Sequence, residues 1–314
     1  MRCARALLVG LLLGGALAGC NRSEEPVVFG LAGPFRTAYG ASMRRGAELA
    51  VKEINAAGGI HNRPLELLEM DDAALPDSAY AVADSLFDNP AVVAVVGHVN
   101  SGTTVQAAEV YQRGLPAVAT SATSPEISRL GDWIFRVASS DSANAVQLAR
   151  LANRIDVPTA LLYQDEDYGR GLTESFRTAF ESQGGRLLET DPYLPDTEDL
   201  TPFLERMKRS GVQLVFIAGL EEDAARIIRQ AQQVGLDARF LGGDGLEGLV
   251  NMGSDFDGTL VGLLYHPDSS PEAASFAERY RAAYHRDADS FAALGYDATR
   301  LLAQAARQAG ASRE

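Results

Sequence analysis

Small and hydroxyl-bearing residues follow two short runs rich in valine and alanine, at the point where each run ends. They are Ser101 and Gly102 after the run 92–96, and Ser121, Ala122 and Thr123 after the run 117–119. Hydroxyl groups and free backbone N–H groups are hydrogen-bond donors, and together they can hold a small carboxylate without any covalent step. A plainer interpretation is that these residues only cap the helices that follow. Because two consecutive loops carry the same residue types, we favour a site for a small carboxylate.

An acidic residue and two aromatic residues complete the set of candidates. Residues 243–248 fit the dinucleotide-binding pattern G-x-G-x-x-G, but Asp244 would face the pyrophosphate and no long helix clearly follows. We therefore interpret this segment as a flexible turn that presents Asp244 past the end of a strand. Tyr168 lies in a loop between a predicted strand and a predicted helix, and Tyr39 lies near the start of an earlier helix. The plainer interpretation of Tyr168 is a loop aromatic that caps its own helix, and that of Tyr39 is packing at the start of its helix.

Residues for catalysis or metal binding form no recognisable pattern. The sequence has no G-x-S-x-G motif, so Ser101 with His98 is a poor hydrolase pair, and we interpret His98 as a packed residue at a strand end. The four histidines show no metal-ligand spacing with Cys, Asp or Glu, so we expect no metal site and no cofactor. Asp71 and Asp72 are more typical of caps and solvated charge than of catalysis. An enzyme of the extracytoplasmic space is therefore the least favoured class.

Strands and helices are predicted to alternate along the whole chain after residue 26. The first run of expected strands is Val27–Leu31, Leu65–Met70, Val92–Val96, Ala117–Ala119 and Trp133–Val137. The second run is Thr159–Tyr163, Arg186–Glu189, Val212–Ile217, Arg239–Leu241 and Leu260–Tyr265. This alternation predicts an α/β protein of two doubly wound lobes, each a parallel sheet with helices on both faces. Ligands bind past the carboxyl ends of such strands, where we expect Ser101, Ser121 and Thr123 at helix N-termini.

The N-terminus has the form of a bacterial export signal. Two arginines precede the apolar run 7–18, which is too short to span a bilayer with ease. The ending Leu17-Ala18-Gly19-Cys20 resembles the lipoprotein signal, and in that family the chain is cleaved before the cysteine, which then carries lipid. An ordinary signal with a chance cysteine is the alternative. We expect a signal peptide at 1–19, lipidation at Cys20 and a short tether at 20–26.

Charge and cysteine content narrow the range of partners. The chain carries a net charge of −14, which becomes −16 when a signal containing Arg2 and Arg5 is removed. A surface this acidic argues against binding to nucleic acid and against electrostatic adhesion to anionic lipid. No second stretch is apolar enough to cross a membrane, so we expect membrane contact only through the lipid on Cys20. No disulfide is expected within the mature chain, because Cys3 leaves with the signal.

In order along the chain, these features resemble the type I periplasmic solute-binding proteins, in particular the leucine/isoleucine/valine-binding group that serves ABC importers. The resemblance covers about residues 28–310. Its most specific segments are FGLAGP (29–34) with Tyr39-Gly40, GAELA (46–50) with INAAGGI (54–60), Gly97-His98 with Ser101, ATSPE (122–126), DYG (167–169) with Gly171, and GYDA (295–298). The family binds its ligand between two lobes that close on it. The resemblance implies a monomeric protein of the bacterial cell envelope, whose partners are an amino acid and an ABC permease.

Carried over one residue at a time, the resemblance assigns a role to each candidate. Ser101 corresponds to the hydroxyl that meets the ligand carboxylate, while Ser121 and Thr123 correspond to positions that contact carboxylate and ammonium. Tyr168 resembles the tyrosine of the second lobe that closes over the ligand. Asp244 stands where branched-chain binders carry an acidic residue for the ammonium. Tyr39 would line the side-chain end of the site, and Gly102, Ala122 and Leu220 complete the expected lining.

The sequence departs from the family pattern in two places. Leu220 falls where several branched-chain binders carry a tyrosine, so the preferred ligand side chain stays open. Family members usually run on past the position of Glu314, and the sequence leaves open whether this end is natural or a truncation. Two other functions within the same class also stay open. One is a sensor that reports ligand to a signalling partner, and the other is a binder of another small carboxylate or amide.

The resemblance also implies how the chain is divided. We expect lobe 1 to comprise residues 27–139 and 266–314, and lobe 2 to comprise residues 140–265. The lobes would close about crossings near Ser139 and Tyr265, with ligand shifting an equilibrium between open and closed forms.

Overall fold

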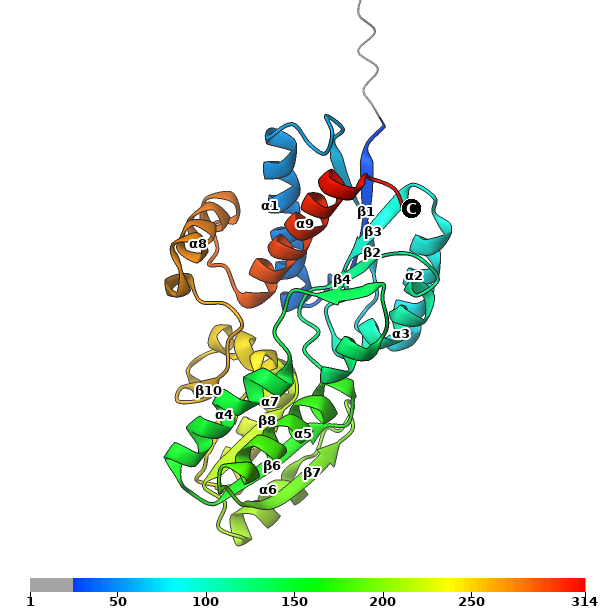
Figure 1. The fold of residues 1–314 in the computed structure, drawn as a ribbon. Helices are drawn as coiled ribbons and strands as arrows, with labels where there is room; N and C mark the ends of the chain where they lie inside the picture. The colour runs from blue at the N-terminus through cyan, green and yellow to red at the C-terminus, as the bar shows by residue number, and fades with distance from the viewer. Residues whose placement is uncertain (1–24, 314) are drawn as a thin grey trace, which may run out of the picture.

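The computed structural model describes residues 25–313, and its strands form two separate five-stranded sheets. All strand pairings within the two sheets are parallel. Figure 1 shows the two sheets and their helices as two lobes, one above the other. The predicted class, two doubly wound α/β lobes, is therefore confirmed.

The upper lobe in Figure 1 is built on a sheet with the strand order β2-β1-β3-β4-β5. The strands are β1 (Val27–Gly33), β2 (Leu65–Asp71), β3 (Val92–Val96), β4 (Ala117–Ala119) and β5 (Ile134–Arg136). One face packs on α1 (Ala38–Ala56) and α9 (Ser290–Ala309), with α8 (Pro271–Tyr284) packed against these two helices, and the other face packs on α2 (Pro76–Asp88) and α3 (Ser101–Tyr111). Strand β3 is apolar throughout because helices cover both faces of the sheet.

The lower lobe has a sheet with the strand order β10-β9-β8-β6-β7. The strands are β6 (Thr159–Gln164), β7 (Leu187–Tyr193), β8 (Leu214–Ala218), β9 (Arg239–Gly242) and β10 (Leu260–Val261). One face packs on α4 (Asp141–Ile155) and α5 (Asp167–Ser182), and the other on α6 (Thr201–Arg209) and α7 (Glu221–Val234). Phe176 of α5 stacks on Phe216 of β8 with ring centroids 3.7 Å apart.

Helix α4 was not predicted, although its sequence carries the usual signal. Ala145, Leu148, Ala149 and Ala152 are spaced at i, i+3, i+4 and i+7, and all four are buried. Three of the four are alanines, so the apolar stripe is weak beside the long side chains of the neighbouring helices. The helix matters because its first residue, Asp141, lies at the junction of the two lobes.

The segment predicted as the strand Leu260–Tyr265 is a strand only at Leu260–Val261. After β10 the chain leaves the sheet and crosses to the other lobe. The N–H groups of Leu264 and Tyr265 donate to the hydroxyl of Ser290, at 3.2 and 3.1 Å, instead of to a neighbouring strand. An apolar run alone does not distinguish a strand from a buried crossing.

Short 3-10 helices replace two loops at the ends of strands. They are η1 (Pro125–Arg129) after β4 and η2 (Asp244–Asn251) after β9, with η3 (Ser254–Phe256) and η4 (Pro267–Ser269) elsewhere. The segment around Asp244, predicted as a flexible turn, is therefore helical.

Two stretches connect the sheets, one between β5 and α4 and the other between β10 and α8. The lobe boundaries at 139/140 and 265/266 stay predictions. The signal peptide, Cys20 and most of the tether lie outside the described residues. No helix within residues 25–313 is long and apolar enough to span a bilayer.

Candidate ligand-binding site

Helix α3 presents its N-terminus past the end of β3, as predicted. Asn100 precedes the helix in an extended conformation, and its side chain does not cap the first turn. Ser101 is the first helical residue and is 1% exposed, and its Oγ accepts a hydrogen bond from the N–H of Ser124 at 3.2 Å. The first turn of a helix carries N–H groups without helical partners and the positive end of its dipole. This end of α3 can therefore receive a carboxylate.

The second loop differs from the prediction, because Ser121 and Thr123 do not begin an α-helix. The chain after β4 stays irregular until η1 begins at Pro125, where the hydroxyl of Ser124 accepts the N–H of Glu126 at 3.4 Å. Proline has no N–H to donate, and a single short 3-10 turn adds little dipole. The hydroxyls of Ser121 and Thr123 are nevertheless buried and have no hydrogen-bond partner among the described residues. These hydroxyls therefore remain able to contact a ligand.

Tyr168 and Asp244 meet in the lower lobe. The hydroxyl of Tyr168 donates to Oδ1 of Asp244 at 3.3 Å and accepts the N–H of Gly245 at 3.1 Å. Tyr168 is the second residue of α5, not a loop residue as predicted. Asp244 is 6% exposed, and burial raises the pKa of its carboxyl to about 6. The tyrosine fixes the orientation of this carboxyl at the carboxyl end of β9.

Asp141 is a site residue that the sequence analysis missed. It is the first residue of α4 and is fully buried, and neither carboxyl oxygen has a hydrogen-bond partner among the described residues. Burial raises the pKa of Asp141 well above its usual range, the nearby charge of Asp244 adds to the shift, and the hydroxyl of Thr123 and the charge of Arg136 oppose it. Its N–H donates to the carbonyl of Thr123 at 2.9 Å, which joins α4 to the loop after β4. The run Ser139-Ser140-Asp141-Ser142 was a usable signal, since such residues are typical of a helix start.

A cavity of about 140 Å³ is lined by both Asp141 and Asp244. Its other lining residues are Asn144, Gln147, Leu148, Leu172, Gly243, Gly262, Leu263 and Leu264. An engineered cavity of roughly 150 Å³ is known to hold benzene, so this volume suits a small molecule. Arg136 lies near Asp141, but its guanidinium donates to the carbonyls of Thr123 and Ser124 and to the hydroxyl of Ser128. Neither of the two acids has an Arg or Lys as a hydrogen-bonding partner in the described part of the chain.

The remaining predicted residues lie around this centre in different ways. The hydroxyl of Tyr39 accepts the side-chain amide of Asn100 at 3.2 Å, and its ring lies 5.2 Å from that of Phe291. Burial raises the pKa of Tyr39 to about 12. These contacts are made to the residue before α3 and to α9, so Tyr39 packs between elements and not only at the start of its own helix. Ala122 is fully buried in the core of the upper lobe, which leaves only its backbone for a ligand.

Gly102 and Leu220 complete the predicted set. A Cβ on Gly102 would lie 3.5 Å from Oδ2 of Asp167, so Gly102 lies where α3 and α5 of the two lobes meet. Leu220 precedes α7 and is half-buried. Its place in the site stays a prediction.

His98 does not activate Ser101. His98 is fully buried, with Nδ1 2.6 Å from Oδ2 of Asp72 and Nε2 3.0 Å from the hydroxyl of Tyr111. Both ring nitrogens are used away from Ser101, so the two residues do not form a nucleophile with its base. The prediction of a packed strand-end histidine is confirmed, whereas the prediction that Asp72 is solvated is wrong, because Asp72 is fully buried.

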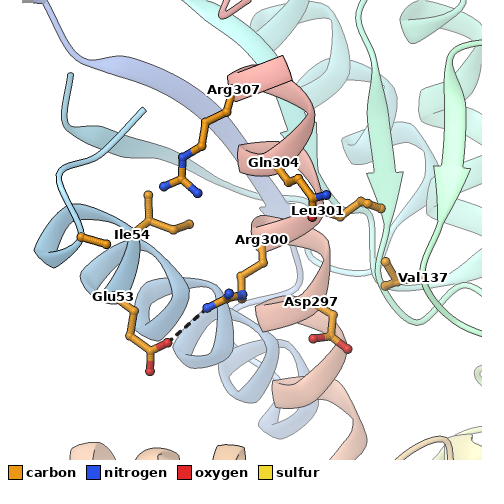
Figure 2. A pocket seen from close by; sticks show the side chains of 9 residues that line it. Glu53, Ile54, Val137, Asp297, Arg300, Leu301, Gln304 and Arg307 are labelled. Carbon is orange, nitrogen blue, oxygen red and sulfur yellow. Dashed lines mark ion pairs between the residues drawn. The ribbon is translucent and has the colours of Figure 1, made fainter. Parts of the chain in front are cut away.

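A larger groove of about 600 Å³ lies in the upper lobe, between α1 and α9. Figure 2 shows the charged side chains that line it. Arg300 pairs there with Glu53 at 3.5 Å, and Arg307 donates to the carbonyl of Gly59. The groove includes none of the predicted site residues, and its two arginines already have partners. It is not the candidate site.

Comparison with known proteins places the chain among binding proteins. The sequence profile of the family described as periplasmic binding protein matches residues 26–314. A Leu/Ile/Val-binding protein homolog of Brucella suis is 29% identical over 98% of this chain and 85% of its own length. The leucine-, isoleucine-, valine-, threonine- and alanine-binding protein of Pseudomonas aeruginosa is 30% identical over 93% of this chain and 81% of its own length.

Solved structures show the same architecture. An ABC transporter substrate-binding protein of Desulfitobacterium hafniense in complex with leucine is 31% identical, with a TM-score of 0.76 over 90% of this chain and 84% of its own. A branched-chain amino acid transporter substrate-binding protein of Streptococcus pneumoniae in complex with isoleucine is 28% identical, with a TM-score of 0.82 over 92% of this chain and 87% of its own. The profile match, the two-lobed fold and the site at the junction agree, and the chain belongs to the periplasmic binding protein family.

Proposed function

We propose that this protein binds an amino acid between its two lobes and delivers it to an ABC importer, without covalent chemistry. The observation that carries the proposal is the pair of buried carboxylates, Asp141 and Asp244, which line one cavity and have no basic side chain bonded to them within residues 25–313. Buried charges are normally paired, so two such groups indicate that a cation belongs between them. The ammonium of an amino acid supplies that cation.

The other end of the ligand would meet the upper lobe. Ser101 and the first turn of α3 receive the carboxylate, together with the free hydroxyls of Ser121 and Thr123. Gly102 and Ala122 contribute backbone N–H groups in these two loops. The N–H of Asp141 bonds the carbonyl of Thr123, so the carboxylate and ammonium subsites are directly connected. A zwitterion satisfies both subsites at once.

Three further residues shape the site in this proposal. Tyr168 orients Asp244 and covers the ligand when the lobes close. Tyr39 and Leu220 lie toward the ligand side chain. A leucine at position 220, in place of the tyrosine of several branched-chain binders, makes the preferred side chain an experimental question. The proteins of Brucella and Pseudomonas named above support a small aliphatic amino acid as the first candidate.

A simple carboxylate fits the site less well than an amino acid does. A ligand without an ammonium would leave both buried carboxyls, Asp141 and Asp244, with no cation bonded to them, which is costly in a low-dielectric site. A signalling role differs from import only in the partner that the closed protein meets. Family membership implies an extracytoplasmic location, and we propose that a lipid on Cys20 holds the mature, monomeric chain at the membrane.

A thermal-shift screen tests the proposed ligand class. The panel contains the twenty amino acids, common amides, and carboxylates that lack an amine. Saturating ligand at about 100 times its dissociation constant should stabilise the protein by ~2.7 kcal/mol, which gives a clear rise in Tm. A rise with amino acids alone supports the proposal. A rise confined to carboxylates without an amine, or conversion of the ligand during long incubation, would contradict it.

A further inference from the structure

Glu247 of the lower lobe binds the N-terminus of a helix in the upper lobe. Its carboxylate oxygens accept the N–H of Ser290 at 3.0 and 3.3 Å. Ser290 is the first residue of α9, which packs along α1 in the core of the upper lobe. Helix α9 already has its own cap, because Asp289 accepts the N–H of Ala292 at 2.8 Å. Glu247 is therefore an additional acceptor for α9, and it belongs to the lower lobe, whereas α9 belongs to the upper lobe.

The same serine holds the crossing chain. Oγ of Ser290 accepts the N–H groups of Leu264 and Tyr265, the two residues that carry the chain from β10 to the upper lobe. Ser290 is 1% exposed, so these bonds lie away from competing water. Glu247, Ser290 and the crossing thus form one continuous hydrogen-bonded chain between the lobes.

Glu247 is also linked to the ligand subsite. Asp244 and Glu247 are three residues apart in η2, and side chains at i and i+3 of a 3-10 helix eclipse each other. Both carboxylates therefore project from the same side of one short turn. Burial raises the pKa of Glu247 to about 7, opposed by its hydrogen bonds from Ser290, and the charges of Asp289 and Asp244 add to the shift. Any movement of η2 at Asp244 displaces Glu247 with it.

We infer that Glu247 is a positioning residue that couples occupation of the Asp244 subsite to the crossing between the lobes, through Ser290. An ammonium that binds Asp244 fixes η2, and Glu247 then holds Ser290 and the crossing in the closed arrangement. The inference rests on the proposed function for the identity of the ligand. Its mechanical part, the link from Glu247 to the crossing, does not need a ligand and can be tested without one.

Hydrogen exchange of the crossing tests this link in the full protein without added ligand. Glu247→Ala should speed exchange in the peptide that contains Leu264 and Tyr265 by about tenfold or more, because Ser290 loses a charged acceptor and the crossing opens more often. Small-angle X-ray scattering should show a larger radius of gyration. The matched control is Glu222→Ala, which removes the same charge from an exposed position in the first turn of α7. The control should leave both measurements at wild-type values.

Ser290→Ala supplies a second arm, because it removes only the hydroxyl that holds the crossing. Its effect on exchange should resemble that of Glu247→Ala, and the double variant should show little more than either single variant, since both break one chain of bonds. If Glu247 only capped α9, Glu247→Ala would leave the crossing protected, and the double variant would show the sum of the two independent single effects. Additive effects would therefore overturn the inference.

Wild-type exchange and scattering in a folded Glu247→Ala variant would also overturn the inference. If that variant does not fold, Glu247→Gln serves in its place, because it keeps one carbonyl acceptor but loses the charge and the second oxygen. The glutamine variant should exchange faster than wild type, and unchanged exchange would contradict the inference. L-leucine, added last, should protect the crossing in wild type and less in Glu247→Ala. If L-leucine does not protect the crossing in wild type, that result argues against the proposed ligand. The result obtained without ligand still stands.

Discussion

Asp141 and Asp244 are the most informative residues of this site, because each is buried and, among the described residues, neither is hydrogen-bonded to an Arg or Lys. Burying a carboxylate is unfavourable, and the raised pKa values of both groups express that cost as a preference for the protonated form. Such an arrangement reduces stability unless a ligand cation relieves it. Functional sites commonly show this conflict between stability and binding.

Replacing Asp141 should separate its effect on stability from its effect on ligand binding. We expect Asp141→Asn to raise the Tm of the protein without ligand, because the amide replaces a carboxyl whose ionised form is unfavourable in this buried position. The same change should weaken amino-acid binding by about one to two decades, since a hydrogen bond to a charged group contributes ~1.5–3 kcal/mol. Thermal unfolding and titration calorimetry measure the two effects. Asp132→Asn, an exposed control, should change neither, and unchanged affinity in Asp141→Asn would remove Asp141 from the site.

The raised pKa of Asp244 predicts how binding depends on pH. The carboxyl has a pKa of about 6 in the folded protein, against an ordinary value of about 3.9. The folded protein therefore holds a proton here that the unfolded chain has released, so the stability that this group contributes is full below about pH 4 and is lost as the pH rises through about 6.

Ligand binding should show the opposite dependence, because the ammonium needs the ionised carboxylate. Affinity should be steady above about pH 7 and should fall roughly tenfold per pH unit well below 6. Calorimetry between pH 5 and pH 8 measures it. Asp244→Asn should bind more weakly with a flatter profile, and a wild-type profile in that variant would assign the titration to another group.

Sequence reasoning found some site residues and missed others for a physical reason. Ser101 and Asp244 were visible because each lies within a few residues of the end of a predicted strand. Asp141 was passed over although the run around it is typical of a helix start. Glu247 was not visible, since its role depends on a contact across the lobes that no local pattern encodes. Asp72 was misjudged for the same reason, because its partner His98 lies 26 residues away.

Elements were predictable where burial on both faces gives continuous apolar runs. Strands β3 and β4 occur at the predicted residues, and the other strands match within a few residues except β10. The incorrect predictions concern the junction of the lobes, where backbone N–H groups donate to side chains and not to neighbouring strands. The crossing after β10 uses the hydroxyl of Ser290, and the loop before η1 uses the hydroxyl of Ser101.

The contact between helix α5 and the loop before η1 can be tested by substitution. A Cβ on Gly171 would lie 2.9 Å from Oγ of Ser124 and 3.1 Å from Cδ of Pro125, which belong to the other lobe. Gly171→Val should therefore hold the lobes apart and weaken binding by about one to two decades, since overpacking costs ~1–3 kcal/mol. Helix propensity does not oppose the change, because valine is a better helix former than glycine.

Small-angle X-ray scattering with saturating amino acid measures this effect. Wild type should become more compact on binding, and Gly171→Val should remain larger. Thr178→Val, at an exposed position of the same helix, should behave as wild type. Equal compaction in Gly171→Val and wild type would show that closure does not bring these two elements together.

For the whole molecule, net charge and the N-terminal sequence predict how the protein is held at the membrane. With a net charge of −14 for the full sequence, attraction to anionic lipid is weak, so attachment should depend on the acyl chains at Cys20. Mass spectrometry of membrane-extracted protein should show a lipid-modified N-terminal peptide that begins at Cys20. Cys20→Ser should release the protein from membranes, whereas Cys3→Ser should not. An intact Met1, or an unmodified N-terminus elsewhere, would refute the anchor.

The central claim is that one zwitterion joins the two lobes, with its ammonium on Asp244. Titration calorimetry of wild type and Asp244→Ala, each with the amino acid selected by the screen and with its analogue lacking the amine, tests it most directly. Removing one partner of a buried charge pair costs ~3–5 kcal/mol, so Asp244→Ala should weaken amino-acid binding by roughly two to three and a half decades. The analogue should bind wild type poorly and lose little further affinity in the variant. Wild-type affinity for the amino acid in Asp244→Ala, or tight binding of the analogue by wild type, would contradict the claim.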